Sequence, residues 1–199
     1  MYVPKHFGEG DGEKLAALID ENGFGVLVTV SEGRPFASHI PFIYEREANV
    51  LLGHVARANP QWRHFSIGSE VMVVFQGPHA YVSPSWYRSP GVPTWNYAVA
   101  HVYGSAEALE EPSRIKGIIE RLAGKYERNN KPPWVPTYDP RLLGAIVGIE
   151  VRIKEVQGKF KLSQNRSAAD RAAVVAKLEA TGSEGDLALA RLMEKNKIA

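Results

Sequence analysis

Three segments of the 199-residue chain gather polar, basic and aromatic side chains that could bind a ligand. In the first, residues 53–62 (GHVARANPQW), a predicted strand ends in a basic loop and a helix begins at Asn59-Pro60. A guanidinium offers paired donors and a helix N-terminus favours an anion, so Arg57 could bind a phosphate here. The alternative is that Arg57 is a solvated loop residue and Asn59 only a helix cap.

The second segment is rich in rigid aromatic side chains. Residues 75–87 (FQGPHAYVSPSWY) and 92–97 (VPTWNY) together contain six Phe, Trp and Tyr residues. Such rings, interleaved with Thr, Asn and Ser, could stack on a planar ligand and form hydrogen bonds to its rim. A minor core or a dimer interface uses the same residue types, and both interpretations stay open.

The third segment, residues 161–166 (KLSQNR), ends the last predicted strand and is almost entirely polar. Its donors suit the polar edge of a heterocycle or a phosphate, although the segment could simply cap the next helix. The six histidines show no spacing typical of metal ligands, so we expect no metal site. The sequence has no nucleophile-elbow, Walker or dinucleotide-binding motif, and we assign no catalytic residue.

The elements that must position these segments are mostly predicted strands. We expect a hairpin of residues 24–30 and 35–44, then strands at 50–56, 70–76, 80–83 (after a break at Gly77-Pro78) and 95–109, and a final hairpin of 145–156 and 159–163 turning at Gly158. Helical spacing of apolar residues predicts helices at 13–21, 114–128, 168–180 and 187–195. Six or seven closely spaced strands favour an antiparallel barrel with peripheral helices over a Rossmann sheet. We expect residues 1–182 to form this domain and residues 183–199 to form a C-terminal helical tail.

Charge and composition limit the classes of partner. Lys and Arg number 24 and Asp and Glu number 22, so no global field favours nucleic acid or a membrane surface. Without cysteine the chain can form neither disulfides nor thiolate metal sites. The first residues do not resemble a signal peptide, and no apolar run is long enough to cross a membrane. We therefore expect a cytoplasmic protein without a membrane partner.

Several of these blocks, taken in order, carry a family resemblance. Met1–Pro4 with Phe7, GHVARANPQWR at 53–63, GPHAYVSPSWY at 77–87, VPTWNY at 92–97 and KLSQNR at 161–166 closely resemble the PaiB family. That family is described as FMN-binding negative transcriptional regulators with a split-barrel flavin-binding fold. The resemblance covers nearly the whole chain, and it implies a six-stranded antiparallel split β-barrel and a homodimer with two FMN sites at its interface.

One departure from the family pattern lies at residues 88–91. This stretch is shorter here than is usual in the family, and it contains Arg88 where a lysine is common. If the stretch helps to bind the cofactor phosphate, Arg88 would have to serve alone.

The predicted FMN site combines the three segments. Its phosphate end is assigned to the first segment, its ring to the second, and its remaining contacts to the third, which could come from the other subunit. The predicted cofactor-binding residues are His54, Arg57, Asn59, Trp62, Trp86, Thr94, Trp95, Asn96, Lys161, Gln164, Asn165 and Arg166.

Three functions remain open at this stage. The first is a flavin-binding regulator, as the resemblance implies. The second is an FMN-dependent oxidoreductase, because the same barrel resembles pyridoxamine-phosphate oxidases and flavin reductases. The third is a haem-binding split barrel, which would need a ligand such as His39, His54 or His101. Direct binding to DNA is weakly supported, because the chain shows no helix-turn-helix pattern and is nearly neutral, so an effect on transcription could be indirect.

Overall fold

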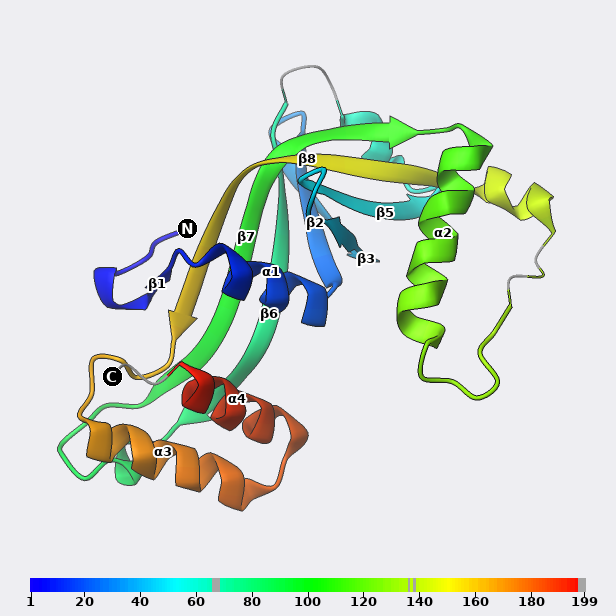
Figure 1. The fold of residues 1–199 in the computed structure, drawn as a ribbon. Coiled ribbons are helices and arrows are strands. Elements are labelled where there is room, and N and C mark those ends of the chain that lie inside the picture. The colour runs from blue at the N-terminus through cyan, green and yellow to red at the C-terminus, as the bar shows by residue number, and fades with distance from the viewer. Residues whose placement is uncertain (66–68, 136, 138, 197–199) are drawn as a thin grey trace. The chain divides into compact units, whose positions relative to one another are not determined.

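A computed structural model of the chain describes residues 1–65, 69–135, 137 and 139–196 (Figure 1). It confirms a mainly antiparallel β fold with peripheral helices. The strands are β1 (Gly8–Glu9), β2 (Phe24–Ser31), β3 (Arg34–Pro41), β4 (Ile43–Glu45), β5 (Val50–Ala56), β6 (Val71–Val82), β7 (Thr94–Leu109) and β8 (Ile146–Lys161). The α-helices are α1 (Gly12–Glu21), α2 (Pro112–Glu127), α3 (Ala168–Thr181) and α4 (Glu184–Lys195). Short 3₁₀ turns are η1 (Lys5–Phe7), η2 (Pro60–His64), η3 (Pro84–Trp86) and η4 (Pro140–Ala145).

The described residues form an 8-stranded sheet, whereas the sequence pattern predicts six or seven strands and the family resemblance implies six. Six of the strands are long, and the two additional ones are β1 and β4, of 2 and 3 residues. A strand this short cannot show the alternation of apolar and polar residues by which strands are recognised in a sequence. Both exist because a longer strand pairs with them: β1 with β8, and β4 with β5.

Two predicted interruptions are wrong, because β6 and β8 run unbroken through Gly77 and Gly158. These two glycines do not form turns; they allow neighbouring atoms to approach the strand closely. A Cβ on Gly77 would lie 2.4 Å from Leu18 Cδ1, and a Cβ on Gly158 would lie 2.7 Å from the carbonyl oxygen of Glu9. Glycine inside a strand marks such an approach as often as it marks a bend.

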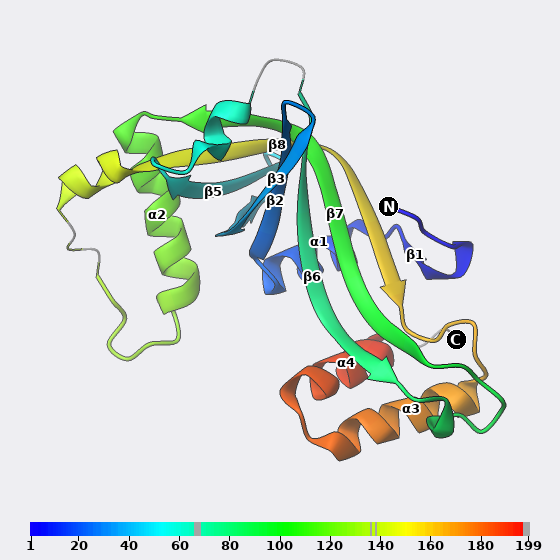
Figure 2. The ribbon, with the colours of Figure 1, turned by 180° about the vertical axis from the view of Figure 1, so that it is seen from behind.

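The described part of the chain forms two compact units, and each is built from separate stretches of sequence. The first unit comprises Met1–Leu18, Gln76–Ala100 and Gln157–Ala199. Helices α3 and α4 pack against each other there (Figure 2), with Val174, Leu178 and Leu189 fully buried. The division at residue 182, between a barrel domain and a helical tail, stays a prediction.

The second unit comprises Ile19–Phe75 and His101–Val156. Its interior is apolar, with Leu27, Leu51 and Ile149 completely buried. The strand order of the whole sheet is β3-β2-β6-β7-β8-β5-β4, so β3 and β5 are far apart in the order. Nevertheless β3 and β5 contact each other within this unit. The sheet therefore curls back on itself at a seam between two strands that are not neighbours in that order.

Gly104 provides a stability test of the second unit. A Cβ at this position would lie 2.2 Å from the backbone oxygen of Arg152 on β8. We expect Gly104→Ala to lower the free energy of unfolding by about 1–3 kcal/mol, as overpacking does. Gly124→Ala is the matched control, since a Cβ there meets nothing within 4 Å; it should raise the free energy by about 0.5–1 kcal/mol through helix propensity. Urea unfolding that shows both variants at or above wild-type stability would contradict this packing.

Candidate functional site

A groove of about 560 Å³ lies in the second unit, at the seam where β3 meets β5. It is lined by residues 37–41 of β3, residues 54–56 of β5, Asn59 and Ile146. Asn59 crosses the seam, because its Nδ2 donates a hydrogen bond to Ser38 Oγ at 2.9 Å. Strand β3 ends the strand order, so its outer edge carries backbone N–H and C=O groups without a strand partner among the described residues. These groups can form hydrogen bonds with a ligand in the groove.

The short helix η2 holds the end of this groove in place. Asn59 Oδ1 accepts a hydrogen bond from Gln61 N at 3.0 Å and so caps η2, as the sequence predicts. Gln61 is completely buried, and its Nε2 donates to Leu27 O at 2.9 Å and to Phe36 O at 3.2 Å. Helix η2 is thereby bound to the β2–β3 hairpin, which fixes the position of Asn59.

Arg57 is held in one orientation at the end of β5. Its Nε donates to Gly144 O at 2.7 Å, one terminal nitrogen donates to Ile146 O at 3.3 Å, and the other donates to Glu110 at 2.6 Å. Of the five N–H groups of a guanidinium, these bonds occupy three among the described residues. The side chain is 38% exposed, so its two other N–H groups can reach a ligand. Trp62 Nε1 donates to Arg57 O at 3.1 Å, and Trp62 therefore supports the backbone at this point.

His54 lines the groove and carries an unpaired polar atom. The residue is half-buried, and its Nδ1 is buried without a hydrogen-bond partner in the described part of the chain. Burial lowers the pKa of His54, so the imidazole is neutral at pH 7 and has one donor and one acceptor nitrogen. Unpaired buried polar atoms are rare in folded proteins. Because Nδ1 is also shielded from solvent, the groove is lined by the rest of the half-buried ring, against which a planar ligand could pack.

In the first unit, Lys161 lies against the beginning of β7. Its Nζ donates to Thr94 Oγ1, and to Trp95 O at 2.5 Å. Burial lowers the pKa of Lys161, and the neighbouring charges of Lys159 and Arg166 lower it further. Three basic side chains near one another favour an anionic ligand at this place.

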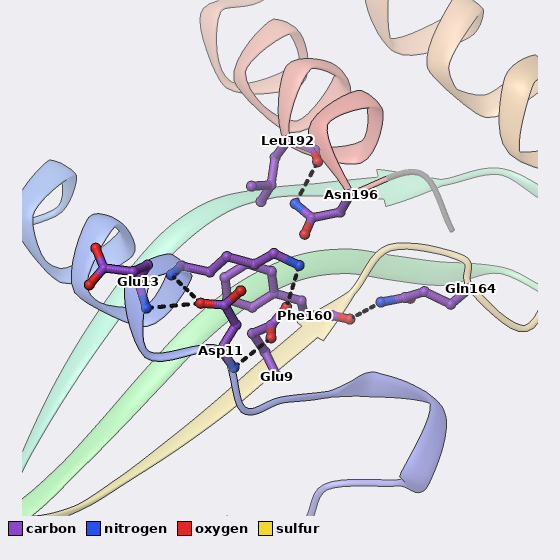
Figure 3. Close-up of polar contacts among 8 residues, drawn as sticks. Glu9, Asp11, Glu13, Phe160, Gln164, Leu192 and Asn196 are labelled. Carbon is purple, nitrogen blue, oxygen red and sulfur yellow. Dashed lines mark hydrogen bonds and ion pairs between the residues drawn. The ribbon is translucent and has the colours of Figure 1, made fainter. Parts of the chain in front are cut away.

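Two of the predicted cofactor-binding residues, Asn96 and Gln164, have polar groups paired within the chain. Buried Asn96 donates from Nδ2 to Ser163 Oγ at 2.9 Å. Gln164 accepts from Leu162 N at 2.7 Å and donates from Nε2 to Phe160 O at 2.5 Å (Figure 3). These side chains stabilise the turn that follows β8.

The other predicted residues of the first unit differ in exposure. Trp95 is 54% exposed, so its ring is available for stacking. The Arg166 guanidinium lies over the ring of Tyr87, with its Cζ 4.6 Å from the centroid. Trp86 is half-buried in η3, and Asn165 is exposed in the turn after β8.

The twelve predicted residues thus belong to two groups. His54, Arg57, Asn59 and Trp62 gather around or behind the groove of the second unit. The other eight lie near the ends of β7 and β8 in the first unit, or in the turns beside them. Ser38 and His39 line the groove from β3 but were not among the predicted FMN-binding residues, and His39 was considered only as a haem ligand. Nothing local marks these two residues, because their role depends on contact between strands that are distant in the sheet.

Within residues 1–65, 69–135, 137 and 139–196, no group of three His, Cys, Asp or Glu side chains is arranged to hold a metal ion. In the same part of the chain, none of the helices has both the length and the apolar character needed to span a membrane.

Comparison with known proteins identifies the family that this sequence matches. The sequence model described as "Putative FMN-binding domain" matches residues 1–155. The chain is also 38% identical to the protease synthase and sporulation protein PAI 2 of Bacillus subtilis, over 98% of this chain and 97% of that protein. An uncharacterised protein of Emericella nidulans is 29% identical over the same shares of the two chains.

Solved structures agree on the fold. The flavocytochrome Anf3 from Azotobacter vinelandii superposes with a TM-score of 0.66 at 14% identity, over 86% of this chain and 78% of that one. The FAD and heme binding protein from Mycobacterium smegmatis gives 0.65 at 19% identity, over 83% and 78%. At such low identity these likenesses show the split-barrel fold and nothing about the ligand.

Asp170 of α3 fixes the short stretch of residues 88–91. Its carboxylate is buried and accepts hydrogen bonds from Arg88 N at 2.7 Å, Ser89 N at 3.1 Å and Ser89 Oγ at 2.6 Å. The bond from Ser89 Oγ, with the backbone N–H donors, lowers the pKa of Asp170 to about 2. The backbone of the segment is therefore fixed by a charged carboxylate.

Replacing Asp170 should make the stability of the protein less sensitive to acid. The folded-state pKa lies below the ordinary value of 3.8, so the carboxylate stabilises the fold above that value and loses its effect as the pH falls towards 2. We expect Asp170→Asn to be less stable than wild type at pH 7, and the difference to shrink between about pH 5 and pH 2. Urea unfolding over this range measures it, with the exposed Glu179→Gln on α3 as control. A difference that does not depend on pH would contradict the charged anchor.

Proposed function

Because this chain belongs to the PaiB family of FMN-binding domains, we propose that it binds FMN in the groove between β3 and β5. The main support for the proposal is the contact between β3 and β5. One groove of about 560 Å³ combines the outer edge of β3, which has no strand partner among the described residues, with the half-buried His54. Arg57 is held in place directly after Ala56, the last β5 residue that lines this groove. This volume lies within the range of about 300–1,000 Å³ that is usual for ligand pockets.

The groove supplies different partners to the two ends of FMN. The outer edge of β3 and the neutral His54 offer donors and acceptors to the rim of the flavin ring. The two remaining N–H groups of Arg57 can donate to the phosphate. Glu110 lies 2.6 Å from Arg57 and offsets much of its charge, so a phosphate dianion needs further basic groups.

We propose that those basic groups come from a second copy of the chain. In the resulting homodimer, Lys161 and Arg166 of one subunit would face the groove of the other. Two features support this arrangement: the first unit presents a basic cluster at the end of β8, and Trp95 leaves more than half of its surface open to a partner.

When bound, FMN would supply hydride or electron transfer, while the residues of the chain bind and orient it. We assign no acid, base or nucleophile to the protein, so whether it is an enzyme depends on what the flavin reacts with. Cytoplasmic location and direct contact with DNA stay predictions from the sequence.

Substitutions at the end of β5 test the groove. Ala56 lines it and is exposed, so Ala56→Phe should fill it and abolish saturable FMN binding. Ala58→Phe, two residues further along and outside the lining, is the matched control and should bind like wild type. Arg57→Ala should weaken FMN by about one to two powers of ten, from the loss of a charge-assisted bond. FMN fluorescence titration measures all three, and equal affinity in all three variants would exclude this groove.

The homodimer has its own test. Sedimentation equilibrium at micromolar concentration should show a dimer, because each groove is completed by a second subunit. Trp95→Asp should shift the protein towards monomer and weaken FMN together, since a charge on this exposed position would lie in the interface. A stable wild-type monomer that binds FMN tightly would refute the shared site and leave the groove itself intact.

A further inference from the structure

A second cavity of the second unit lies beneath α2 and has no role in the proposed FMN site. Its volume is about 420 Å³, which again suits a small ligand. In both ribbon views α2 runs beside β5 and β8 (Figures 1 and 2). The cavity has an apolar floor and a charged wall. The floor is formed by Val50, Leu52, Leu109 and Ile118, and the wall by Glu45, Arg114, Arg121 and Glu150.

Strand register places the acidic side chains around the floor. Glu45 on β4 is paired directly with Val50, and Glu150 on β8 is paired directly with Leu52. Paired residues of antiparallel strands lie on the same face of a sheet, as do the alternate residues Val50 and Leu52. Both carboxylates therefore lie on the face that carries the floor.

Helix α2 supplies the basic side chains. Arg114 and Arg121 are seven residues apart, which puts them on one face of the helix and about 10 Å apart along its axis. Arg114 lies 2.6 Å from Glu150, and Arg121 lies 2.9 Å from Glu45. The wall thus consists of two pairs of opposite charges. Glu150 also pairs at 3.2 Å with Arg152, which lies outside the lining and whose side chain is 71% exposed to solvent.

This arrangement selects the net charge of a ligand. The four wall residues sum to zero, and Glu150 is only 7% exposed. A ligand with one net charge would leave an unbalanced charge beside a buried carboxylate, which is costly. A ligand that carries both signs can pair with an arginine and with a carboxylate while preserving the balance.

Gly117 keeps the space open. It lies on α2 between the two arginines and lines the cavity. A Cβ at this position would meet nothing within 4 Å, so close packing does not demand glycine there. Glycine inside a helix is also less favourable than alanine. Glycine at position 117 therefore makes the helix less stable than alanine would, and it leaves room for a ligand.

We propose that this cavity binds a free α-amino acid with an aliphatic side chain. Its carboxylate would accept hydrogen bonds from Arg114 or Arg121, and its ammonium group would donate to Glu45, because both oxygens of Glu150 are already paired with arginines. Its side chain would cover the apolar floor. This site is separate from the FMN groove and does not depend on flavin binding.

Calorimetric titration of the full-length protein tests the proposal with L-leucine, L-methionine and L-valine as probes. At least one should bind saturably at millimolar concentration or below. The analogues L-leucinamide and N-acetyl-L-leucine lack the carboxylate and the ammonium group respectively, and each should bind at least tenfold more weakly than L-leucine. No saturable binding by the three amino acids, or equal binding by the analogues, would overturn the proposal.

A matched pair of glycine variants locates the site. Gly117→Leu should fill the cavity and abolish amino-acid binding. Gly124→Leu, on the same helix with equally open space but outside the lining, should leave binding unchanged. Wild-type affinity for FMN in both variants shows that they are folded. If Gly117→Leu binds the amino acid as wild type does, the cavity is not its site; if that variant fails to fold, the analogue series on the wild-type protein still decides the ligand class.

Discussion

The antiparallel register between β5 and β8 determines where both ligand-binding regions of the second unit form. Leu52 pairs with Glu150, and Ala56 pairs with Ile146. The ladder continues to Arg57, whose N donates to Ala145 O at 2.8 Å, so its side chain reaches Gly144 O. A slip of one residue would turn every side chain of β5 to the opposite face of the sheet. One pairing thus positions Glu150 in the charged wall beneath α2 and Arg57 beside the FMN groove.

Polar residues near the proposed FMN site fall into two kinds. Gln61 is buried with its amide N–H groups bonded to Leu27 O and Phe36 O, and it holds η2 against the β2–β3 hairpin. His54 and Arg57 keep groups that the described residues do not satisfy, and the outer edge of β3 has no strand partner among them. Fixed supports beside unsatisfied groups give a preorganised site, because a ligand gains hydrogen bonds without the protein having to rearrange.

Local signals in the sequence predicted the elements better than their connections. The strand at 50–56 and the cap at Asn59 were predicted correctly, since β-branched runs and Asn-Pro starts act over a few residues. Gly77 and Gly158 were misread as breaks, because a glycine looks the same in a turn and at a close approach. Ser38 and His39 were not predicted for the FMN site, because β3 and β5 are not neighbours in the strand order and no local signal shows that they meet. Arg57 and Asn59 could be proposed from the sequence because the end of a strand and the start of a helix are adjacent there.

Hydrogen exchange of the backbone amides, measured with and without FMN, tests most directly whether the seam between β3 and β5 is the flavin site. Amides on the outer edge of β3 have no strand partner among the described residues, so they should exchange fast in the free protein. We predict that FMN slows amide exchange in residues 34–41 and 54–59 and does not change the exchange rates of helix α2. Saturating FMN that leaves residues 34–41 unprotected, or protects only segments away from the seam, would contradict it.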